Sequence, residues 1–421
     1  MIRSNDKAWS DLAAKVAKRG GDGDLFVREL QNLYSIFTPD FATWIGGLYD
    51  HEIGGFYAAN SGRDTEGYYP DIESTYQAVN TIATVGIVKK ATDLPPAMRE
   101  RMISFISSLQ SPDDGYIYHP QWDYNDPEWR HRDSRVGRDM MWAIALEGEL
   151  DFKLPYPTAN DRLKALASGE SSDVKLPDHL TSREAFVAYL DKLDWVNDAY
   201  FAGNMLAAQA GQIKAAGLAP CAAEYLGKIQ NTDNGLWGKY DSYDGVNALL
   251  KIAAFYSAVG IPIPNAHAAV ESTLKCTCAP LDRERATVCW QYNVWFALQY
   301  LVNNIRKCDG NEAADALIER MMKFAPEAIR ATKEKIEIFK LPDCSFTYMY
   351  GKPSFVSQGA PVACPADGVL EGNVNASVIC LHRTVEALLA AFGLDMPPIY
   401  GEEDYERFLA AVKQHNVNIC L

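Results

Sequence analysis

Two stretches of the chain, 120 residues apart, repeat the same local pattern, and this repeat limits the possible folds more than any other feature. Phe105–Gln110 and Tyr225–Gln230 each have the pattern of a helix end closed by a glutamine. A turn rich in Asn and Asp follows, and then Gly115 or Gly235 before a bulky apolar residue. Gly55 precedes an aromatic residue one 60-residue period earlier. A period near 60 accommodates two helices and their turns, so the sequence predicts a series of helical hairpins.

Helical periodicity extends over most of the remaining sequence. Apolar residues recur mostly at i, i+3, i+4 and i+7 in eleven segments, and the alternation typical of strands is nearly absent. These segments are Ile72–Val88, Pro95–Leu109, Asp139–Leu150, Ser182–Leu193, Pro220–Ile229, Asp244–Val259, Pro264–Leu274, Val288–Val302, Asn311–Phe324, Val374–Phe392 and Glu402–Val412. The sequence therefore predicts an all-α protein.

The length of the chain indicates how the hairpins are arranged. A chain of 421 residues exceeds the ~250–300 residues that one hydrophobic core usually holds, yet no linker separates the repeats. About six hairpins fill this length, which is the number needed to close a ring. We therefore predict a single α/α toroid over residues 1–421, with N-terminal helices in residues 1–40 and a polar surface excursion over residues 150–180.

The repeat resembles that of a known superfamily. A helix ending in Leu-Gln or Ile-Gln, followed by Ser111–Tyr116 or Asn231–Trp237, is similar to the glutamine and aspartate-glycine repeat of terpenoid cyclases and protein prenyltransferases. Pro70–Thr75 is similar to the acid motif Asp-x-Asp-Asp-Thr of class II terpenoid cyclases, with a glutamate and a serine in place of two aspartates. Leu48–Phe56 resembles the first turn of sugar epimerases of the N-acylglucosamine epimerase type. These resemblances imply a toroid, a fold that hosts isoprenoid, sugar and peptide chemistry.

The charge balance limits the partners of the protein. The formal net charge is −15 and the pI is near 5, so the protein repels phosphate backbones and anionic membrane surfaces. The first residues alternate charged and apolar side chains, and no stretch approaches the ~20 apolar residues of a membrane span. We expect a cytoplasmic protein that has no nucleic-acid or membrane partner and acts on a small molecule.

The sequence gives no sign of a cofactor or a metal. Nine cysteines are an odd number, which is typical of reduced thiols in the cytosol. Neither Cys276 and Cys278 with Cys289, nor Cys380 with His382, matches the spacing of zinc ligands. The chain also lacks a Gly-rich phosphate loop and a dinucleotide fingerprint. We therefore predict neither a cofactor nor a metal site.

Polar residues at the starts of the inner helices are expected to converge, because these helices begin at one rim of the toroid cavity. Asp71, Glu73 and Asp139 are the candidate catalytic acid and base residues. Glu73 is the sharpest candidate, because burial in an aromatic-lined cavity is expected to raise the pKa of its carboxyl group. For Asp71, a structural role as the N-cap of the following helix is an equally good interpretation.

Two further groups of residues are candidates for substrate binding. The segment Gln121–Asp139 combines tryptophans that stack on sugar rings with arginines that hold a carboxylate or phosphate, although a solvated loop has the same composition. Aromatic residues beside Asn or Asp recur at helix starts, where packing in the core is the alternative. The candidate set is Arg63, Asp64, Tyr69, Trp122, Tyr124, Trp129, Arg135, Arg138, Trp195, Asp198, Tyr200, Trp237, Tyr243, Asp244, Trp290, Tyr292, Asn293, Glu371, Asn373 and Asn375.

Three functions are consistent with these residues. The density of Arg, Asp, Asn and Gln at helix starts favours a carbohydrate hydrolase, lyase or epimerase. The alternative is an isoprenoid cyclase or transferase, in which Asp71 and Glu73 protonate an alkene. A third possibility is a binding protein without catalysis. A cavity wall of mainly aromatic side chains favours the isoprenoid hypothesis, and a wall of amides, carboxylates and arginines favours the sugar hypothesis.

Overall fold

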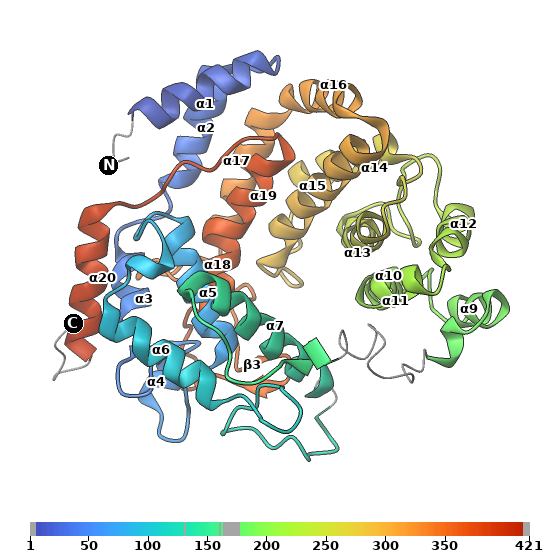
Figure 1. Ribbon diagram of the computed structural model, residues 1–421. Coiled ribbons are helices and arrows are strands. Elements are labelled where there is room, and N and C mark those ends of the chain that lie inside the picture. The colour runs from blue at the N-terminus through green and yellow to red at the C-terminus, as the bar shows by residue number, and fades with distance from the viewer. Residues whose placement is uncertain (1–5, 130–131, 160, 163–176, 416–421) are drawn as a thin grey trace.

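The structure, a computed structural model, describes residues 6–129, 132–159, 161–162 and 177–415 (Figure 1). Helices account for 59% of the chain and strands for 4%, which confirms the predicted all-α class. The helices are α1 (Asp6–Lys18), α2 (Gly23–Tyr34), α3 (Asp40–Gly46), α4 (Asn60–Asp64), α5 (Ile72–Thr84), α6 (Pro96–Ser108), α7 (Arg132–Leu150), α9 (Arg183–Leu190), α10 (Ala199–Ala208), α11 (Ala210–Ala215), α12 (Ala219–Ile229), α13 (Tyr243–Val259), α14 (Ala266–Cys278), α15 (Cys289–Asp309), α16 (Asn311–Met322), α17 (Ala325–Glu337), α18 (Val374–Val378), the π-helical turn η4 (Ile379–Arg383), α19 (Thr384–Ala391) and α20 (Glu402–His415). Two short antiparallel hairpins pair β1 (Tyr49–Asp50) with β2 (Gly55–Phe56) and β3 (Val356–Ser357) with β4 (Ala360–Pro361).

The longer helices pack in two layers. Helices α10, α13, α15 and α19 lie side by side in that order, and α18, which continues through η4 into α19, packs on α5, which packs on α7. We call these the inner helices. Helices α9, α12, α14 and α17 alternate with them along the chain, and Figure 1 shows α12, α14 and α16 toward the periphery. Apolar side chains of the two layers form the core.

Neighbouring inner helices run parallel. Near the start of α5, Glu73 bonds to Arg138 of α7, and farther along both helices Asn80 bonds to Glu149. Side chains at the starts of α13 and α15 are hydrogen-bonded to each other in the same way. These inner helices therefore begin on the same side of the molecule, where Trp122 and Ser357, from the loops over residues 109–129 and 338–373, also lie.

The two copies of the repeated turn have the same hydrogen bonds. The Nε2 atom of Gln110 donates to the carbonyl oxygen of Gly115 at 3.3 Å and to the next connecting segment at 2.9 Å. The Nε2 atom of Gln230 donates to the carbonyl oxygen of Gly235 at 2.9 Å and to its own next connection at 2.8 Å. The two glycines have φ angles of 77° and 69°, a left-handed conformation that favours glycine. The sequence repeat is therefore a structural repeat.

Two other expectations concern single segments. Of the predicted surface excursion over residues 150–180, residues 160 and 163–176 lie outside the described residues, and Tyr156 is tied to the repeated turn through the side chain of Gln110. The helical stretch Val374–Ala391 is long and apolar enough to cross a membrane, with a mean hydropathy of 1.2, and 78% of it is buried inside the molecule. A core helix of a soluble protein has the same properties.

Candidate functional site

A fully buried arginine, Arg135, holds three carboxylates together at the starts of α5 and α7. The exposed fraction of its side chain is 0%. Its Nη2 atom donates to Asp71 Oδ1, its Nη1 atom to Glu73 Oε2 and its Nε atom to Asp139 Oδ2, each at 3.0 Å. All three candidate catalytic residues therefore surround one guanidinium group. We call these four residues, together with Arg138, the arginine cluster.

Local sequence explains how the cluster assembles. Asp71 caps α5, since its carboxylate accepts hydrogen bonds from the backbone N–H of Ser74 at 3.0 Å and from the Ser74 hydroxyl at 2.7 Å. Glu73 follows in the first turn of the same helix. Positions 135, 138 and 139 share one face of α7, because residues three and four apart are neighbours on a helix. Arg138 donates to Glu73 Oε1 from Nε at 2.8 Å and from Nη2 at 2.5 Å.

The arginine cluster contains more carboxylates than guanidinium groups. Three carboxylates and two arginines carry a net charge of −1 when all are ionised. Burial disfavours the ionised form of Glu73, but Arg138 and Arg135 together outweigh burial and lower its pKa, so the expected increase is wrong. Burial raises the pKa of Asp139 to about 7, against the attraction of Arg135. At pH values below about 7, the proton that balances the cluster therefore resides on Asp139.

An indole ring and the β3–β4 hairpin cover the cluster. The guanidinium carbon of Arg135 lies 4.4 Å from the ring centroid of Trp122. The Trp122 indole N–H donates to the carbonyl oxygen of Pro361 at 3.1 Å. From the same hairpin, the hydroxyl of Ser357 donates to Glu73 Oε2 at 2.9 Å. Two loops that are far apart in the sequence thus meet above the buried charges.

A cavity of about 310 Å³ lies beside the cluster. All three carboxylate residues are buried, with Asp71 and Glu73 each 2% exposed and Asp139 1% exposed, but only Glu73 lines the cavity. Around Glu73, the polar part of the lining consists of Ser74, Gln77, Tyr348, Ser354, Ser357, Gln358, Asn373 and Asn375. Amide and hydroxyl groups of this kind suit a ligand that carries many hydroxyl groups.

Arg138 links the cluster to three other inner helices. Burial lowers the pKa of Lys251 on α13, and the charge of Arg138 lowers it further. The same charge acts on Tyr200 of α10 and on Cys289 of α15. The ammonium group of Lys251 lies 5.1 Å from the ring centroid of Tyr200, and Lys251 makes no salt bridge with any residue that the structure describes. Side chains from four inner helices therefore lie within electrostatic range of one another.

A further cation, Arg383, lies on the same tryptophan ring as Arg138. The guanidinium carbon of Arg383, in η4, lies 5.4 Å from the ring centroid of Trp142, and that of Arg138 lies 5.6 Å from the same centroid. The ring of Tyr76 stacks on Trp142 at 4.4 Å. Single π-helical turns occur frequently at functional sites. Two stacked aromatic rings and two arginines therefore lie together on α5, α7 and η4.

Comparisons with known proteins identify no family for this chain. The chain matches no protein-family model, no curated protein and no solved structure. The likeness of the repeats to terpenoid cyclases and sugar epimerases stays a prediction from the sequence. The contacts of the described residues are therefore the basis for a functional proposal.

A second cavity, of about 500 Å³, lies between α13, α14, α15 and α17. Three of the predicted substrate-binding residues line it, namely Tyr243, Asp244 and Trp290. The rings of Tyr243 and Trp290 stack with centroids 4.3 Å apart, and the Tyr243 hydroxyl accepts a hydrogen bond from Asn293 at 3.1 Å. Asp244 pairs with Arg285 at 3.2 Å. The predicted binding residues are therefore divided among several cavities, since Trp122 and Trp129 line a third, of about 450 Å³, and Arg63 lines a fourth, of about 520 Å³.

Several predicted binding residues belong to the core instead. Trp195 and Trp237 are 7% and 1% exposed, and their indole N–H groups donate to backbone carbonyl oxygens at 2.8 and 2.9 Å. The backbone thus satisfies both indole N–H groups, as is usual for tryptophans that pack in a core. Arg135 is equally enclosed and cannot contact a substrate. The burial of these three side chains favours a structural role over the predicted role in substrate binding.

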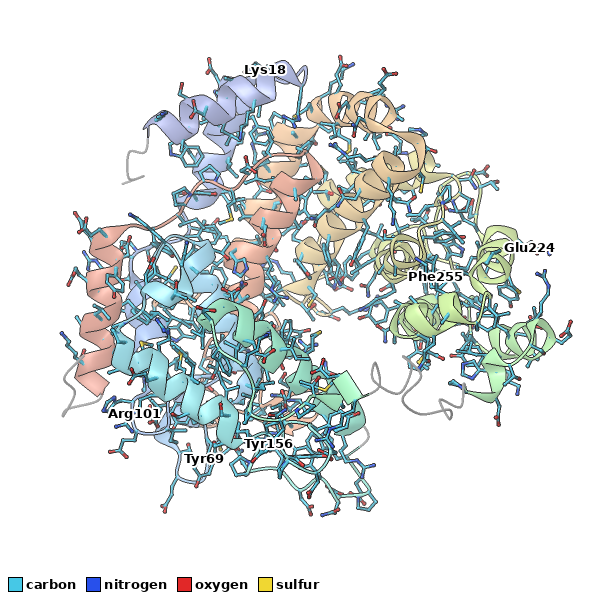
Figure 2. The ribbon with its side chains drawn as sticks, in the orientation of Figure 1. Lys18, Tyr69, Arg101, Tyr156, Glu224 and Phe255 are labelled. Atoms are coloured by element: carbon cyan, nitrogen blue, oxygen red, sulfur yellow. The ribbon has the colours of Figure 1, made fainter. Side chains whose placement is uncertain are left out.

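Other predicted residues stabilise loops and helix ends. Tyr124 and Trp129 pack together at 5.4 Å beside Trp122, outside the 310 Å³ cavity. Tyr69 is 45% exposed at the edge of the molecule (Figure 2), and Arg63 pairs with its neighbour Asp64 at 2.7 Å.

The remaining predicted residues lie at helix starts or on the inner helices. Asp198 and Asn373 cap α10 and α18. Glu371 accepts a hydrogen bond from the backbone N–H of Ser61 at 2.9 Å. Tyr292 stacks on the next turn of α15, and Asn375 bonds to Gln77 in the cavity lining. Of this group, Asn373 and Asn375 line the cavity beside Glu73.

Metal ligands are not grouped in the part of the chain that the structure describes. No three His, Cys, Asp or Glu side chains there form a potential metal site, and the described cysteines are free. Burial raises the pKa of the Cys276 thiol to about 11, which favours the neutral thiol. His382 is buried, and its Nδ1 atom lies 2.9 Å from the Thr81 hydroxyl, so it is a hydrogen-bonded core residue.

Sequence analysis missed two hydroxyl residues that line the cavity and two cations on the inner helices. Lys251 and Arg383 supply positive charge, and Ser357 and Tyr348 contribute hydroxyl groups from the loop over residues 338–373. The two cations had a detectable signal, because each is an isolated positive charge within an apolar run of an inner helix. The two hydroxyl residues lie in a loop whose path the helical pattern does not determine.

Proposed function

We propose that this chain forms an α/α toroid and is an enzyme that abstracts a proton from a carbohydrate, as a lyase or an epimerase, with Glu73 as the base. The observation that carries the proposal is the position of Glu73. It is the one carboxylate of the arginine cluster that lines the cavity, and its lowered pKa keeps it ionised at neutral pH. An ionised carboxylate accepts a proton, as general base catalysis requires.

The number of carboxylates that line the cavity favours proton abstraction over glycoside hydrolysis. Most glycosidases place two carboxyl groups on either side of the bond that they cleave. Here Asp71 and Asp139 are buried behind Arg135 and do not line the cavity. Elimination and epimerisation each begin with one base that removes one proton, which Glu73 can supply alone.

The hydrogen bonds of Glu73 indicate how a substrate would reach it. Its Oε1 atom accepts from Arg138 and from Gln77, whereas its Oε2 atom accepts from Arg135 and from the hydroxyl of Ser357. The Ser357 hydroxyl is the donor that belongs to the covering hairpin and also faces the cavity. We expect a substrate to displace this hydroxyl, so that Oε2, still bonded to Arg135, has a lone pair with which to accept a proton.

The ionisation of Glu73 also bears on the isoprenoid alternative. Protonation of an alkene requires a neutral carboxylic acid in contact with the substrate. Glu73 is ionised, and Asp139, whose pKa is raised to about 7, does not line the cavity. The parallel inner helices, the contact between α18 and α5 and the repeated turns support the toroid.

A matched pair of glutamates tests the proposal. Glu73→Gln removes the base, whereas Glu224→Gln makes the same change on the outer surface of α12 (Figure 2). In Glu73→Gln, two arginines face Asp71 and Asp139, so ionisation of Asp139 balances the charges and the fold is expected to persist. With a panel of oligosaccharides, turnover is followed by the absorbance of new double bonds and by NMR detection of epimers.

We expect Glu73→Gln to lower turnover by about 100-fold or more, the usual contribution of a general base. Glu224→Gln should turn over substrate at the wild-type rate. A wild-type protein that changes none of the saccharides, or a Glu73→Gln variant with full activity, would exclude the proposed function. Circular dichroism of both variants checks that each is folded.

A further inference from the structure

We propose that the side chains of Gln77 and Asn375 together bind one hydroxyl group of the substrate, close to the carbon that loses its proton to Glu73. This inference rests on the proposed function, because it names the substrate group that the same site recognises. It makes that hydroxyl a requirement for binding, so sugars that lack it, or carry it as an ether or ester, are excluded. The evidence is an unpaired carbonyl oxygen, the amide that adjoins it and the residues that line the cavity.

The side chain of Gln77 has a buried oxygen without a partner. Gln77 is 1% exposed and lines the 310 Å³ cavity, and its Oε1 atom makes no hydrogen bond to any described residue. Most buried carbonyl oxygens in folded proteins accept at least one hydrogen bond. A ligand in the cavity that carries an O–H or N–H group would supply the missing donor.

The contacts of the Gln77 amide nitrogen establish that the unpaired atom is the oxygen. Its Nε2 atom donates to Glu73 Oε1 at 3.1 Å and to Asn375 Oδ1 at 3.2 Å. An ionised carboxylate can only accept, so an amide turned the other way would place two acceptor oxygens against each other. Both N–H groups of Gln77 are therefore used within the protein, and its oxygen is the atom that needs a donor.

Asn375 supplies a donor at the same place. Its Oδ1 atom accepts from Gln77, and its Nδ2 group makes no hydrogen bond to the described residues. The residue is half-buried and lines the cavity. The free acceptor and the free donor thus belong to two amides that contact each other. A hydroxyl group can donate to one and accept from the other, which neither an ether oxygen nor a carboxylate can do.

The charge of the cavity lining favours a neutral group over an acidic one. Among the described residues that line the cavity, Glu73 is the one whose side chain is charged at neutral pH. Gln77 is bonded directly to that carboxylate, so an anionic group beside Gln77 would be repelled at short range. A hydroxyl group meets no such repulsion.

The bond between Gln77 and Glu73 relates the hydroxyl to the base. Gln77 lies one turn after Glu73 on α5, and its Nε2 atom fixes the amide against the carboxylate. A hydroxyl bound to the oxygen of the same amide therefore holds the sugar beside Glu73. Holding a reacting group in place next to a catalytic group contributes to the rate as well as to binding. We therefore expect Gln77 to orient the substrate as well as to bind it.

The test is a double-mutant cycle between Gln77 and a sugar hydroxyl, measured as binding. The probes are D-glucose, D-galactose and D-mannose with their monodeoxy derivatives, and dissociation constants are determined by calorimetry. Gln77→Met removes the amide at similar size, and Asn375→Ala removes the donor. Gln291→Met is the matched control, because Gln291 is 4% exposed and also has an unpaired Oε1 atom, but lines the 500 Å³ cavity. Circular dichroism checks that each variant is folded.

We expect wild-type protein to bind at least one of the sugars, and one deoxy derivative of that sugar to bind about 10- to 100-fold more weakly, the worth of one hydrogen bond to a buried partner. Gln77→Met and Asn375→Ala should weaken binding of the parent sugar by a similar factor and leave binding of that deoxy derivative unchanged. Gln291→Met should change neither. Added salt should leave all these affinities unchanged, because the ligand carries no charge.

Two outcomes would overturn the inference on binding alone. If Gln77→Met weakens binding of the parent sugar and of every deoxy derivative equally, the effect does not depend on a hydroxyl, as a purely structural role of Gln77 predicts. If Gln291→Met abolishes binding and Gln77→Met does not, the sugar occupies the second cavity. Failure of every sugar to bind would overturn the inference as well.

Turnover separates the inference from the proposed function. Binding that depends on Gln77 and on one hydroxyl, of a sugar that is never turned over, would retain the hydroxyl site and exclude the enzyme. Turnover that depends on Glu73, of deoxy derivatives that all bind as tightly as the parent sugar, would overturn the hydroxyl site and leave the enzyme in place.

Discussion

Replacement of Arg135 by methionine should destabilise the protein in a strongly pH-dependent way. The wild-type cluster has three carboxylates and two arginines and reaches neutrality with one proton, held by Asp139. Arg135→Met leaves one arginine, so a second carboxylate has to take up a proton. Protonating a carboxyl group of pKa near 4 at pH 7 costs about 4 kcal/mol, because each pH unit contributes about 1.4 kcal/mol. Loss of one partner of a buried ion pair costs a similar ~3–5 kcal/mol.

The sign of the pH dependence follows from the same reasoning. Without Arg135 the folded-state pKa of the second carboxyl group lies above its unfolded-state value, so stability is retained at low pH and lost as pH rises. The free energy of unfolding, measured in urea at pH 5 and pH 7, should differ from wild type by about 1.4 and about 4 kcal/mol. Arg183→Met, which removes an exposed ion pair with Glu224, serves as the control and should change little at either pH. An Arg135→Met variant with the same stability loss at both pH values would refute the charge accounting.

Three further predictions test the cluster and the repeated turn. Because its folded-state pKa is raised to about 7, Asp139 contributes stability at low pH that is lost as pH rises through 7; Asp139→Asn should flatten this slope in urea unfolding between pH 5 and 8. In Glu73→Gln, carboxyl NMR titration should show the Asp139 pKa well below 7. Gly235→Ala should cost about 2 kcal/mol or more, because φ is 69° and an added Cβ would lie 2.4 Å from the Ala269 nitrogen. Gly227→Ala on the exposed face of α12, where an added Cβ meets nothing within 4 Å, should stabilise the protein by about 0.5–1 kcal/mol. The free energy of unfolding of both glycine variants is measured by thermal unfolding.

The repeat could be read from the sequence because its information is local. Gln110 and Gln230 each bond to a glycine five residues further along, so the residues of the pattern and this hydrogen bond lie within one turn. Such a motif forms the same turn at any position in the fold. Periodicity gave the helices for the same reason, since the apolar stripe is a property of each segment alone.

The candidate site was only partly predictable, because burial depends on the whole fold. Asp71, Glu73 and Asp139 come together because each lies near the start of one of two adjacent helices, and helix starts are visible in the sequence. The sequence does not show that the Arg135 guanidinium lies between these three carboxylates. The indoles of Trp195 and Trp237 could be assigned to the core only once their backbone acceptors were known.

The arginine cluster is a poor device for stability alone. Burying several charges costs desolvation energy that their attraction often fails to exceed, and a well-packed apolar replacement of such a group is frequently as stable or more so. The cluster does fix the position of the Glu73 carboxylate, because Arg138 donates to its Oε1 atom and Arg135 donates to its Oε2 atom. It also provides ionisation, because the surplus proton resides on the enclosed Asp139 and not on Glu73. A carboxylate that is fixed, charged and placed at the edge of a cavity is what a general base requires, and this is why we assign the chemistry to Glu73 and a supporting role to the other two acids.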